Sequence, residues 1–342
     1  MMDLKEVQEI GYLDFSDIKI AVVGDCMLDI YYYGTVDRIS PEAPVPIFKA
    51  NNAEPEFRLG GACNTALNLA KLGVQTSLFG FVGKDIGASY IETYLSENNI
   101  DSHLFKLSNF PTITKNRYFA NNQQIIRIDQ EDTNDNLYNK KNKDKLILSL
   151  TNREDYYHAI IISDYGKGAL SGLTLNTILT ECKQPPIFVD PKITDWGHYE
   201  GAFCITPNWK EFKNACHVPN LKFHLGEVAK YAMDQCLKHN IEHILITLGS
   251  DGMVLINKNT DVIVQPAKAA EIYDVSGAGD TVIATIAAAY CKSLSMSICM
   301  QLATMASKVV IGKLGTYAIT NSELQVELLN AYTGKDNYSG DV

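Results

Sequence analysis

The sequence lacks any hydrophobic segment long enough to cross a membrane. None of its apolar runs approaches the roughly 18 residues that a transmembrane helix needs. Residues 1–10 are acidic on balance and have no apolar core like that of a secretory signal peptide. These two absences predict a cytoplasmic protein without membrane association.

Basic residues are also scarce. Lys and Arg together number 30 against 40 Asp and Glu, which gives a formal net charge of −10 and an isoelectric point near 5.2. Proteins that bind nucleic acid usually carry a basic field, so a nucleic-acid partner is not expected. Any site for a phosphorylated ligand must therefore gather its cations locally.

Patterns for metal binding and disulfide bonding are missing as well. The eight cysteines include no Cys-x-x-Cys pair, and several lie inside apolar segments, where free thiols are commonly buried. The seven histidines have no metal-ligand spacing, and His239 and His243 flank an expected helix-to-strand junction. Neither a disulfide framework nor a zinc site is predicted.

What the chain of 342 residues does contain is a regular alternation of strand and helix patterns. Short β-rich runs, typical of strands buried on both faces, alternate with amphipathic helices, and this predicts an α/β fold with a mostly parallel sheet flanked by helices. In such sheets ligands bind at the carboxyl ends of the strands. The expected strands are 18–23, 75–82, 159–163, 187–190, 202–206 and 243–247, and the clearest helices are 62–72, 89–97, 226–239 and 281–290.

Two stretches break this alternation and predict a small β-sheet that projects from the main body, here called the lid. Residues 31–50 are rich in Tyr and Pro, and residues 112–129 carry Thr, Ile, Tyr and Phe at strand-like intervals. Pro41, Pro44 and Pro46 exclude a helix and suit turns or an edge strand. The expected organisation is an N-terminal extension over 1–15, one domain over 16–330 that includes the lid, and a tail over 331–342.

Residues 274–281, Asp-Val-Ser-Gly-Ala-Gly-Asp-Thr, form the most informative segment. They place Gly277, Gly279 and Asp280 directly before an apolar run expected to form a buried helix. The start of a helix exposes unpaired N–H groups and the positive end of the helix dipole, and the glycines let a phosphate approach them. The segment predicts an anion site with a carboxylate base beside it. The alternative is an ordinary helix start with Asp280 as the capping side chain.

Two segments in the first part of the chain offer polar groups to a second ligand. Gly60 and Gly61 precede a helix with Asn64 in its first turn, where backbone N–H groups and an amide can meet sugar hydroxyls. Asp25 follows the first strand and Asp29 lies four residues on, so both carboxylates can accept hydrogen bonds from ligand hydroxyls. Either segment could equally be a tight or capped turn.

Two more segments follow strands at the same edge of the sheet. Asn208-Trp209-Lys210-Glu211 begins a candidate helix, and its amide and carboxylate can hold a Mg²⁺ ion that keeps several waters. Glu211 could instead only stabilise the first helical turn. Residues 247–252, which start at Thr247 and contain Gly249 and Gly252, can pass close under a nucleotide, although the same pattern is that of a hairpin turn.

In this order and spacing the segments resemble the ribokinase-like (PfkB) carbohydrate kinase family over nearly the whole chain. The resemblance implies a ribokinase-like fold and an ATP-dependent sugar kinase that uses Mg²⁺, held by Glu211 through water. It implies that Asp280 is the catalytic base, that Gly277, Ala278 and Gly279 form the anion hole, and that Gly60, Gly61 and Asn64 bind the sugar. The expected ATP-binding residues are Asn208, Trp209, Lys210, Glu211, Thr247, Gly249 and Gly252.

Within the family, four segments more narrowly resemble the kinase domains of bifunctional heptose kinase/adenylyltransferases of lipopolysaccharide precursor synthesis. That resemblance implies phosphorylation of the anomeric C1 hydroxyl of D-glycero-β-D-manno-heptose 7-phosphate by ATP. The sequence has no His-x-Gly-His adenylyltransferase element, so the second activity is expected to be absent from this chain and supplied by a separate protein. The four segments are 38–46, 111–115, 122–124 and 163–168.

The chemistry of phosphoryl transfer fits a weak carboxylate base, because alignment and charge neutralisation matter more than base strength. The positive end of the helix is expected to lower the pKa of Asp280 and keep it ionised, ready to orient the C1 hydroxyl and take its proton late. Two alternatives stay open. One is a kinase of the same fold for another sugar, sugar phosphate or nucleoside, and the other is a sugar- or nucleotide-binding regulator without catalysis.

Five cations in or beside the lid oppose the acidic balance of the whole chain. Our hypothesis is that two or three of them bind the phosphate that the sugar already carries, although each could be a solvated lid residue. The five are Arg38, Lys115, Arg117, Arg127 and Lys167.

The lid is also expected to form a homodimer. Its apolar positions exceed what a thin projecting sheet can bury alone, and an exposed apolar patch of that kind usually marks an interface. These positions include Ile47, Phe48, Ile113, Phe119 and Ile125.

Overall fold

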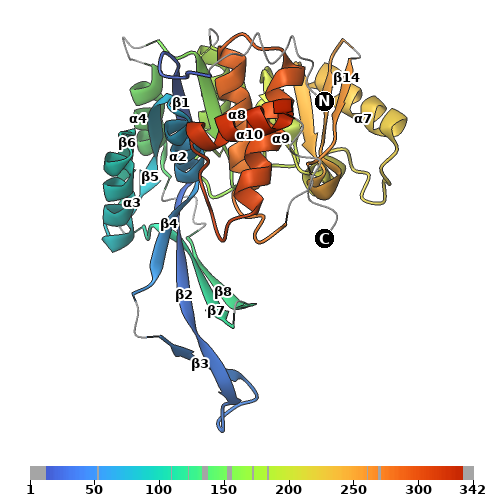
Figure 1. Ribbon diagram of the computed structural model, residues 1–342. Coiled ribbons are helices and arrows are strands. Elements are labelled where there is room, and N and C mark those ends of the chain that lie inside the picture. The colour runs from blue at the N-terminus through green and yellow to red at the C-terminus, as the bar shows by residue number, and fades with distance from the viewer. Residues whose placement is uncertain are drawn as a thin grey trace, which may run out of the picture.

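A nine-stranded sheet forms the centre of the protein in the computed structural model (Figure 1). The structure describes residues 13–333 except 52–53, 109, 122, 133–137, 152–155, 172, 183–184, 260 and 269–270. Most of the expected N-terminal extension and tail, and Asn122 of the narrower resemblance, therefore lie outside the described residues.

The sheet is mostly parallel, as predicted. Its strands run in the order β14-β13-β12-β11-β10-β9-β1-β5-β6, and only the pairs β12–β13 and β13–β14 are antiparallel. All six expected strands are present, although the expected strand 202–206 shortens to two residues. The strands are β1 Lys19–Gly24, β5 Gln75–Val82, β6 Asp101–Lys106, β9 Ala159–Ser163, β10 Ile187–Asp190, β11 Cys204–Ile205, β12 His243–Thr247, β13 Met253–Asn257 and β14 Val262–Gln265.

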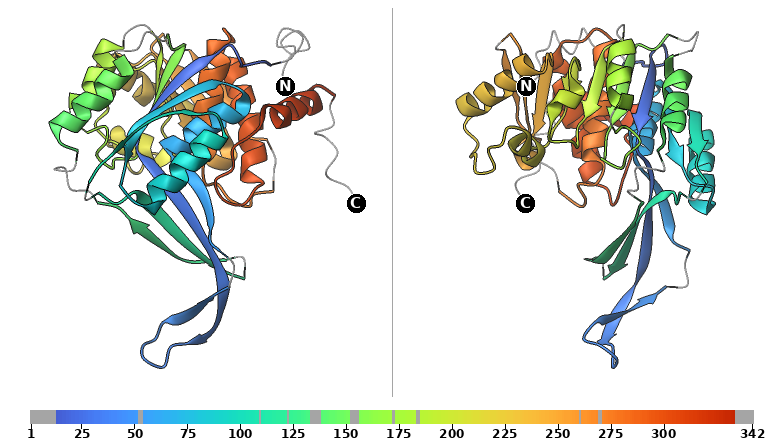
Figure 2. Two further views of the ribbon diagram at one scale, coloured as in Figure 1. Left: turned by 90° about the vertical axis from the view of Figure 1, so that its left-hand side faces the viewer. Right: turned by 180° about the vertical axis from the view of Figure 1, so that it is seen from behind.

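Helices cover both faces of this sheet, because successive side chains of a strand point to opposite faces. On β1, Ile20 and Val22 belong to a core with α2, α3, α8, α9 and α10, whereas Ala21 and Val23 pack on the other face with α4, α5, α6 and α7 (Figures 1 and 2). The helices are α2 Ala62–Leu72, α3 Ile86–Glu97, α4 Lys140–Thr151, α5 Leu173–Glu181, α6 Trp209–Ala215, α7 Leu225–Lys238, α8 Ala278–Cys291, α9 Met296–Ile311 and α10 Asn321–Thr333, with 3₁₀ turns η1 Trp196–Tyr199 and η2 Gly249–Asp251.

Two helices begin earlier than their apolar patterns predict, in each case by three residues. The Asp85 carboxylate accepts a hydrogen bond from the backbone N–H of Ala88, and this cap starts α3 at Ile86. Helix α8 begins at Ala278, so part of the glycine segment forms its first turn. Among the described residues, no helix is both long and apolar enough to span a lipid bilayer.

The lid projects from one side of the body, as all three views show (Figures 1 and 2). Its central strand, β2, runs for 14 residues and pairs first with β4 and β7 beside the body and then with β3 at the far tip. The lid is larger than predicted, because β2 starts at Cys26 and β4 joins it. Its strands are β2 Cys26–Ile39, β3 Pro46–Ala50, β4 Glu56–Gly61, β7 Ile113–Ala120 and β8 Gln123–Gln130.

Candidate active site

The candidate site lies where the lid joins the carboxyl ends of the central strands. Strands β1, β9 and β10 are parallel neighbours, so the residues that follow or end them, Asp25, Tyr165 and Asp190, share one edge of the sheet. Helix α8 brings Asp280 to the same edge from the C-terminal part of the chain. The lid side of the site is built from residues before 170, and the side around α8 and β12 from residues after 190.

Asp280 is the third residue of α8 and does not cap it. The N-cap is Gly277, with φ 79° and no side-chain cap, which excludes the ordinary capped-helix alternative. The Asp280 side chain is instead buried, with an exposed fraction of 3%.

Three side chains hold the Asp280 carboxylate. Asn64 Nδ2 donates to Oδ2 at 2.7 Å, as its predicted place in the site allows. Thr65 Oγ1 and the Tyr165 hydroxyl both donate to Oδ1 at 3.0 Å. The acid is therefore fixed from α2 and from the loop after β9 at once, and its orientation is set by the tertiary fold.

The expected effect of the helix dipole on Asp280 is wrong in sign. Burial raises the pKa of Asp280 to about 6, although the hydrogen bonds from Asn64, Tyr165 and Thr65 act to lower it. Removal from water thus outweighs the three donors together. A carboxyl with this pKa is mostly ionised at neutral pH and is a stronger base than an ordinary aspartate.

The two glycines before Asp280 have different surroundings. A Cβ on Gly277 would lie 2.7 Å from Asn64 Nδ2, and φ 79° is left-handed, so this position requires glycine. A Cβ on Gly279 would meet no described atom within 4 Å. The first turn of α8 therefore faces open space, as the predicted anion site requires.

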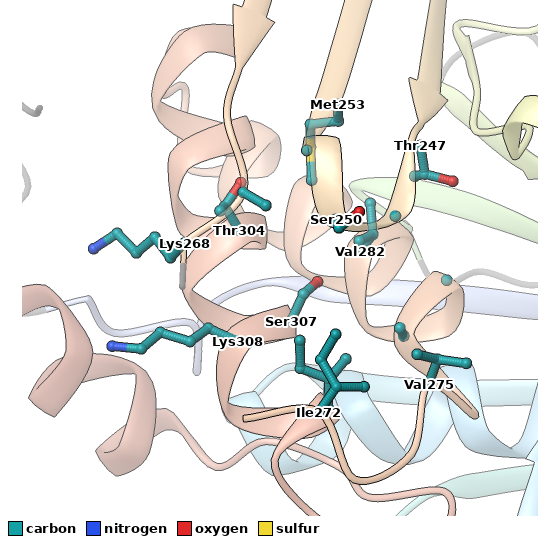
Figure 3. A pocket seen from close by; sticks show the side chains of 16 residues that line it. Thr247, Ser250, Met253, Lys268, Ile272, Val275, Val282, Thr304, Ser307 and Lys308 are labelled. Carbon is teal, nitrogen blue, oxygen red and sulfur yellow. The ribbon is translucent and has the colours of Figure 1, made fainter. Parts of the chain in front are cut away.

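A cavity of about 510 Å³ opens beside this turn (Figure 3). Thr247, Gly249, Gly252, Ala278 and Gly279 line it, which brings the predicted nucleotide loop next to the predicted anion hole. The other wall is mostly apolar and was not predicted; it consists of Ser250, Met253, Ala267, Lys268, Ile272, Val275, Val282, Thr304, Ser307, Lys308 and Ile311. An apolar slot that ends at a helix N-terminus suits a nucleotide base and its phosphates.

Asn208 and Glu211 form the capping box of α6. Asn208 Oδ1 accepts from the N–H groups of Lys210 and Glu211, and Glu211 Oε2 accepts from Asn208 N, each at 3.0 Å. Glu211 Oε1 pairs with Lys192 Nζ at 2.9 Å. The helix-stabilising alternative for Glu211 is thus confirmed. Glu211 nevertheless also lines a second hollow of about 230 Å³, together with Lys192, Asn208 and Lys210.

Trp209 lies in a packed cluster and lines neither cavity. Its ring stacks on Phe212 at a centroid distance of 5.8 Å, and Lys213 Nζ lies 5.6 Å from its centroid. The prediction that Trp209 binds ATP is not supported by this placement, because the neighbouring apolar side chains hold the indole away from the nucleotide cavity.

Asp190 is a candidate site residue that the sequence reasoning did not single out. Burial raises its pKa well above the ordinary value, and the negative charges of Asp280 and Glu211 raise it further. A cation placed among these acids would relieve their repulsion, and carboxylate oxygens suit Mg²⁺. The described residues contain no group of three or more potential metal ligands, so most of the coordination shell would have to come from water and phosphate oxygens.

Asp25 has a structural role beside its predicted sugar contact. Its carboxylate accepts hydrogen bonds from the backbone N–H groups of Tyr165, Lys167 and Ala169 at 2.9, 3.1 and 3.3 Å. Burial still raises its pKa to about 6. These bonds hold the loop that carries Tyr165, and Oδ1, which accepts only from Ala169 among the described residues, keeps a lone pair for a ligand.

Asp29 and Arg117 form a buried ion pair with 2.9 Å between Oδ1 and Nη1. Burial raises the pKa of Asp29, and the guanidinium opposes that rise. A Cβ on Gly60 would lie 3.2 Å from the Asp29 carboxylate, so this glycine lets β4 approach the pair. Arg117 thus already has a carboxylate partner before any phosphate binds.

The remaining predicted cations do not converge. Lys167 pairs with Glu131 at 2.6 Å, and Arg127 pairs with Asp129 at 2.8 Å. Arg38 is exposed near the lid tip, seven residues beyond Tyr31, or about 23 Å away at roughly 3.3 Å per residue. Arg38 therefore cannot join Arg117 in the site of the same chain, and this part of the prediction is wrong.

Lys115 is the predicted cation best placed for a ligand. Its Nζ lies 5.1 Å from the centroid of the Tyr165 ring, and Tyr165 contacts Asp280. Burial lowers the pKa of Lys115, and the charge of Asp29 opposes that change. A partly buried cation above the site is suited to an anionic substrate.

Some of the residues missed by the sequence reasoning carried a usable signal. Thr65 follows Asn64 in an already predicted helix, and Asp190 ends an already predicted strand, where ligand-binding side chains collect. The residues of α9 that line the cavity gave no such signal in the sequence, because Thr304, Ser307 and Lys308 belong to no recognisable motif.

The chain matches a known protein family over most of its length. The family model described as pfkB family carbohydrate kinase matches residues 17–323. A protein named bifunctional protein HldE from Coxiella burnetii (strain RSA 331 / Henzerling II) is 40% identical over 311 residues, which is 91% of this chain and 64% of that protein. Its namesake from Haemophilus influenzae (strain PittEE) is 37% identical over 312 residues with the same coverage. The chain thus spans slightly under two thirds of these relatives.

Solved structures agree on the fold. Phosphofructokinase-2 from Escherichia coli in complex with potassium has a TM-score of 0.75 at 15% identity, over 93% of this chain and 99% of that one. Arabidopsis thaliana ribokinase complexed with ribose and ATP has a TM-score of 0.69 at 18% identity, over 91% and 98%. At such low identity the likeness establishes a ribokinase-like fold.

Proposed function

Because the chain belongs to the pfkB family of carbohydrate kinases, we propose that it transfers the γ-phosphoryl group of ATP to the anomeric C1 hydroxyl of D-glycero-β-D-manno-heptose 7-phosphate. Its class, a phosphotransferase that acts on a sugar, follows from the family match. The observation that carries the reaction is the position of Asp280, a buried acid that Asn64, Thr65 and Tyr165 orient and that directly follows Gly279, a residue lining a nucleotide-sized cavity.

In this proposal Asp280 orients the acceptor hydroxyl and removes its proton as the bond to phosphorus forms. The raised pKa suits this role, because a base near the working pH takes a proton more readily than an ordinary aspartate. The N–H groups at the start of α8 stabilise charge on the transferred group, and Gly279 leaves room for it. The apolar wall beside Val282 and Met253 holds the base of ATP and excludes water.

Mg²⁺ bound with ATP would neutralise phosphate charge during transfer. Asp190 and Glu211 are the residues that would hold it, directly or through water. Lys192, which now pairs with Glu211, would then be free to contact a phosphate oxygen.

The acceptor is inferred from two independent features. Segments 38–46, 111–115 and 163–168 resemble those of heptose kinases, and the relatives named bifunctional protein HldE match 91% of the chain. Lys115 supplies a partly buried cation above Tyr165, on the lid side of Asp280, where the 7-phosphate would bind. Lys167 can also contact the 7-phosphate if its ion pair with Glu131 opens. Both substrates are charged cytoplasmic metabolites, so we place the protein in the cytoplasm.

We further propose that two copies pair through their lids. Strand β8 forms one edge of the lid, and every one of its residues is exposed. These include two isoleucines, Ile126 at 51% and Ile128 at 49%. An exposed apolar edge strand is prone to pair with another chain. Of the apolar positions on which the dimer was first predicted, Ile125 is exposed, but Ile113 is buried within its own chain.

The decisive experiment is a coupled ADP-release assay with heptose 7-phosphate, unphosphorylated heptose, hexoses and hexose phosphates. We expect heptose 7-phosphate to have the highest kcat/KM. We expect Lys115→Ala to raise KM for heptose 7-phosphate at least tenfold, since a charge-assisted hydrogen bond is worth roughly 1.5 to 3 kcal/mol, and to leave KM for ATP nearly unchanged. Lys106→Ala, which removes a surface lysine paired with Glu92, is the matched control.

Other results would decide between the alternatives. Equal kcat/KM for the phosphorylated and free heptose would contradict the phosphate pocket. A clear preference for a hexose phosphate would assign the same chemistry to another sugar. ATP binding without turnover of any acceptor would favour a regulator.

A further inference from the structure

We propose that Tyr165 is a positioning residue that occupies Oδ1 of Asp280 and thereby leaves Oδ2 as the oxygen that accepts the substrate proton. This inference rests on the proposed function, because it concerns the same base. Neither the resemblance nor the matched relatives assign a role to this tyrosine.

The bonding of the two carboxylate oxygens carries the proposal. Each oxygen of an ionised carboxylate has two lone pairs. Oδ1 accepts from both Thr65 and Tyr165 at 3.0 Å, so both of its lone pairs are used. Oδ2 accepts only from Asn64 among the described residues, at 2.7 Å, and keeps one lone pair. A substrate hydroxyl can donate to Oδ2 without displacing any protein group.

Tyr165 is itself held from two sides. Its backbone N–H donates to Asp25 Oδ2 at 2.9 Å, which fixes the start of the loop after β9. Lys115 Nζ lies 5.1 Å from its ring centroid, so a cation from the lid strand β7 rests above the ring. The hydroxyl thus connects Asp280 with both the central sheet and the lid.

This arrangement explains why the residue is tyrosine. Phenylalanine would fill the same space but free one lone pair of Oδ1, so the substrate hydroxyl would then have two acceptor oxygens to choose from. Loss of the donor would also raise the pKa of Asp280, because the Tyr165 hydrogen bond acts to lower it.

The test compares Tyr165→Phe with the unaltered protein by two measurements. The first is the free energy of unfolding at pH 5 and at pH 8. The variant must ionise Asp280 with one donor fewer, so we expect its deficit in stability to be larger at pH 8. The second is kcat for heptose 7-phosphate against pH, where we expect the acidic limb, near pH 6 in the unaltered protein, to move to higher pH. We also expect a fall of roughly 10-fold or more in kcat above the limb, the usual loss for a hydrogen bond to a charged group, with KM for ATP unchanged.

The chain offers a closely matched control. The Tyr317 hydroxyl donates to Glu323 Oε1 at 2.9 Å, and Lys313 Nζ lies 5.7 Å from its ring centroid, so tyrosine, carboxylate and lysine recur outside the active site. Burial acts to raise the pKa of Glu323, but hydrogen bonds from Thr320 and Tyr317 outweigh it and lower the pKa below its ordinary value, so this acid titrates at lower pH than Asp280. The stability deficit of Tyr317→Phe should therefore grow less between pH 5 and pH 8 than that of Tyr165→Phe, and its acidic limb should not move.

Several other charged groups surround Asp280 and also affect the pH at which the acidic limb lies. The test therefore uses the difference in the position of this limb between Tyr165→Phe and the unaltered protein, and not the position in either protein alone. Asp29 faces it from β2, Asp190 from β10 and Lys115 from β7, and Asp25 on the neighbouring loop has a similar pKa. Tyr165→Phe removes no charge, so these groups contribute equally to both profiles.

The outcomes separate the two proposals. Equal stability deficits at pH 5 and pH 8, or an unmoved limb in an active enzyme, would overturn the role of Tyr165 and leave the kinase assignment intact. If the unaltered protein does not turn over heptose 7-phosphate, this sugar is excluded as the acceptor. The stability measurement at pH 5 and pH 8 would still show whether Tyr165 stabilises the ionised Asp280. If Tyr165→Phe does not fold, 3-fluorotyrosine placed at position 165 keeps the ring and donates more strongly, and it should move the limb to lower pH.

Discussion

At the scale of single residues, Asp280 shows how a tertiary fold overrides a local rule. The local rule, that a helix N-terminus stabilises an anion, predicts a lowered pKa for Asp280. The sequence does not reveal that this residue is 3% exposed, and burial raises its pKa to about 6. The ionised form of Asp280, which catalysis needs, therefore reduces the stability of the folded protein at neutral pH.

We expect Asp280→Asn to lower turnover by roughly 10²- to 10⁴-fold, the usual worth of a positioned general base. The native pKa lies above the unfolded value of 3.8, so ionisation of Asp280 reduces stability as pH rises through 6, and an amide removes that loss. The variant should thus be at least as stable as the unaltered protein at pH 8 and should still bind ATP. Steady-state kinetics, denaturant titration and nucleotide binding measure the three effects.

Near-normal turnover of Asp280→Asn would remove this acid from the mechanism. A variant that is much less stable at pH 8 would contradict the raised pKa. Asp234→Asn, an exposed acid on α7, serves as the control and should change neither quantity.

How far single residues could be predicted depends on whether they belong to a local motif. Asp280, Gly277, Gly279 and Asn64 stand in short motifs, and the structure brings them together. That Arg117 binds substrate stays a prediction, and its ion pair with Asp29 was not foreseen because it depends on strand register, which composition does not reveal. Trp209 was misassigned because its motif neighbours face the site while its own side chain packs against Phe212.

At the scale of elements, the first turn of α8 separates the structural from the functional need for glycine. Gly277 is left-handed and crowded by Asn64, whereas a side chain at Gly279 would enter open space. One glycine serves the fold of the protein, and the other leaves room for a ligand.

We expect Gly279→Ala to fold with unchanged or slightly higher stability, by up to about 1 kcal/mol, because alanine favours the helical state. Its methyl group would occupy the space proposed for the transferred phosphoryl group, so kcat/KM for ATP should fall at least tenfold. Gly277→Ala is the paired control, and it should lose about 1 to 2 kcal/mol of stability because of its left-handed φ. Denaturant melts and ATP kinetics of both variants check this contrast. Full activity of Gly279→Ala would show that no phosphate approaches this turn.

The elements themselves were more predictable than their limits. Periodicity identified β5, β9, β10, β12 and α2 with their observed bounds, because buried strands and an amphipathic helix have distinct repeats. The starts of α3 and α8 were missed, since caps and glycine turns, and not apolar residues, determine them. The pairing of β4 with β2 is a long-range contact that no local pattern contains.

At the scale of the whole molecule, the lid is the part least able to stabilise itself. It has little core of its own, and its edge strand β8 is exposed along its full length. A second copy would cover this edge.

We expect light scattering to give a dimer mass at working concentration, and we expect Ile126→Glu on β8 to shift the protein towards monomer with a loss of activity. A charge at this exposed position disfavours edge pairing without disturbing the core of the chain. Leu237→Glu on α7, with an exposed fraction of 65%, is the control far from the lid and should remain dimeric. A fully active monomer would contradict the proposed interface.

The division of the site between an earlier and a later part of the chain bears on how its specificity can evolve. The lid side, with Asn64, Lys115 and Tyr165, is encoded before residue 170, and the nucleotide cavity is formed by residues from 247 onward. Asp280 joins the two halves through Asn64, Thr65 and Tyr165 alone among its described hydrogen bonds. If the sites are divided as proposed, we expect recombination between β9 and β10 to transfer the sugar preference with the earlier part and the ATP site with the later part. Besides the three partners of the base, such an exchange must retain other contacts between the two parts, among them Asn68 with Thr281 and Leu59 with Thr316.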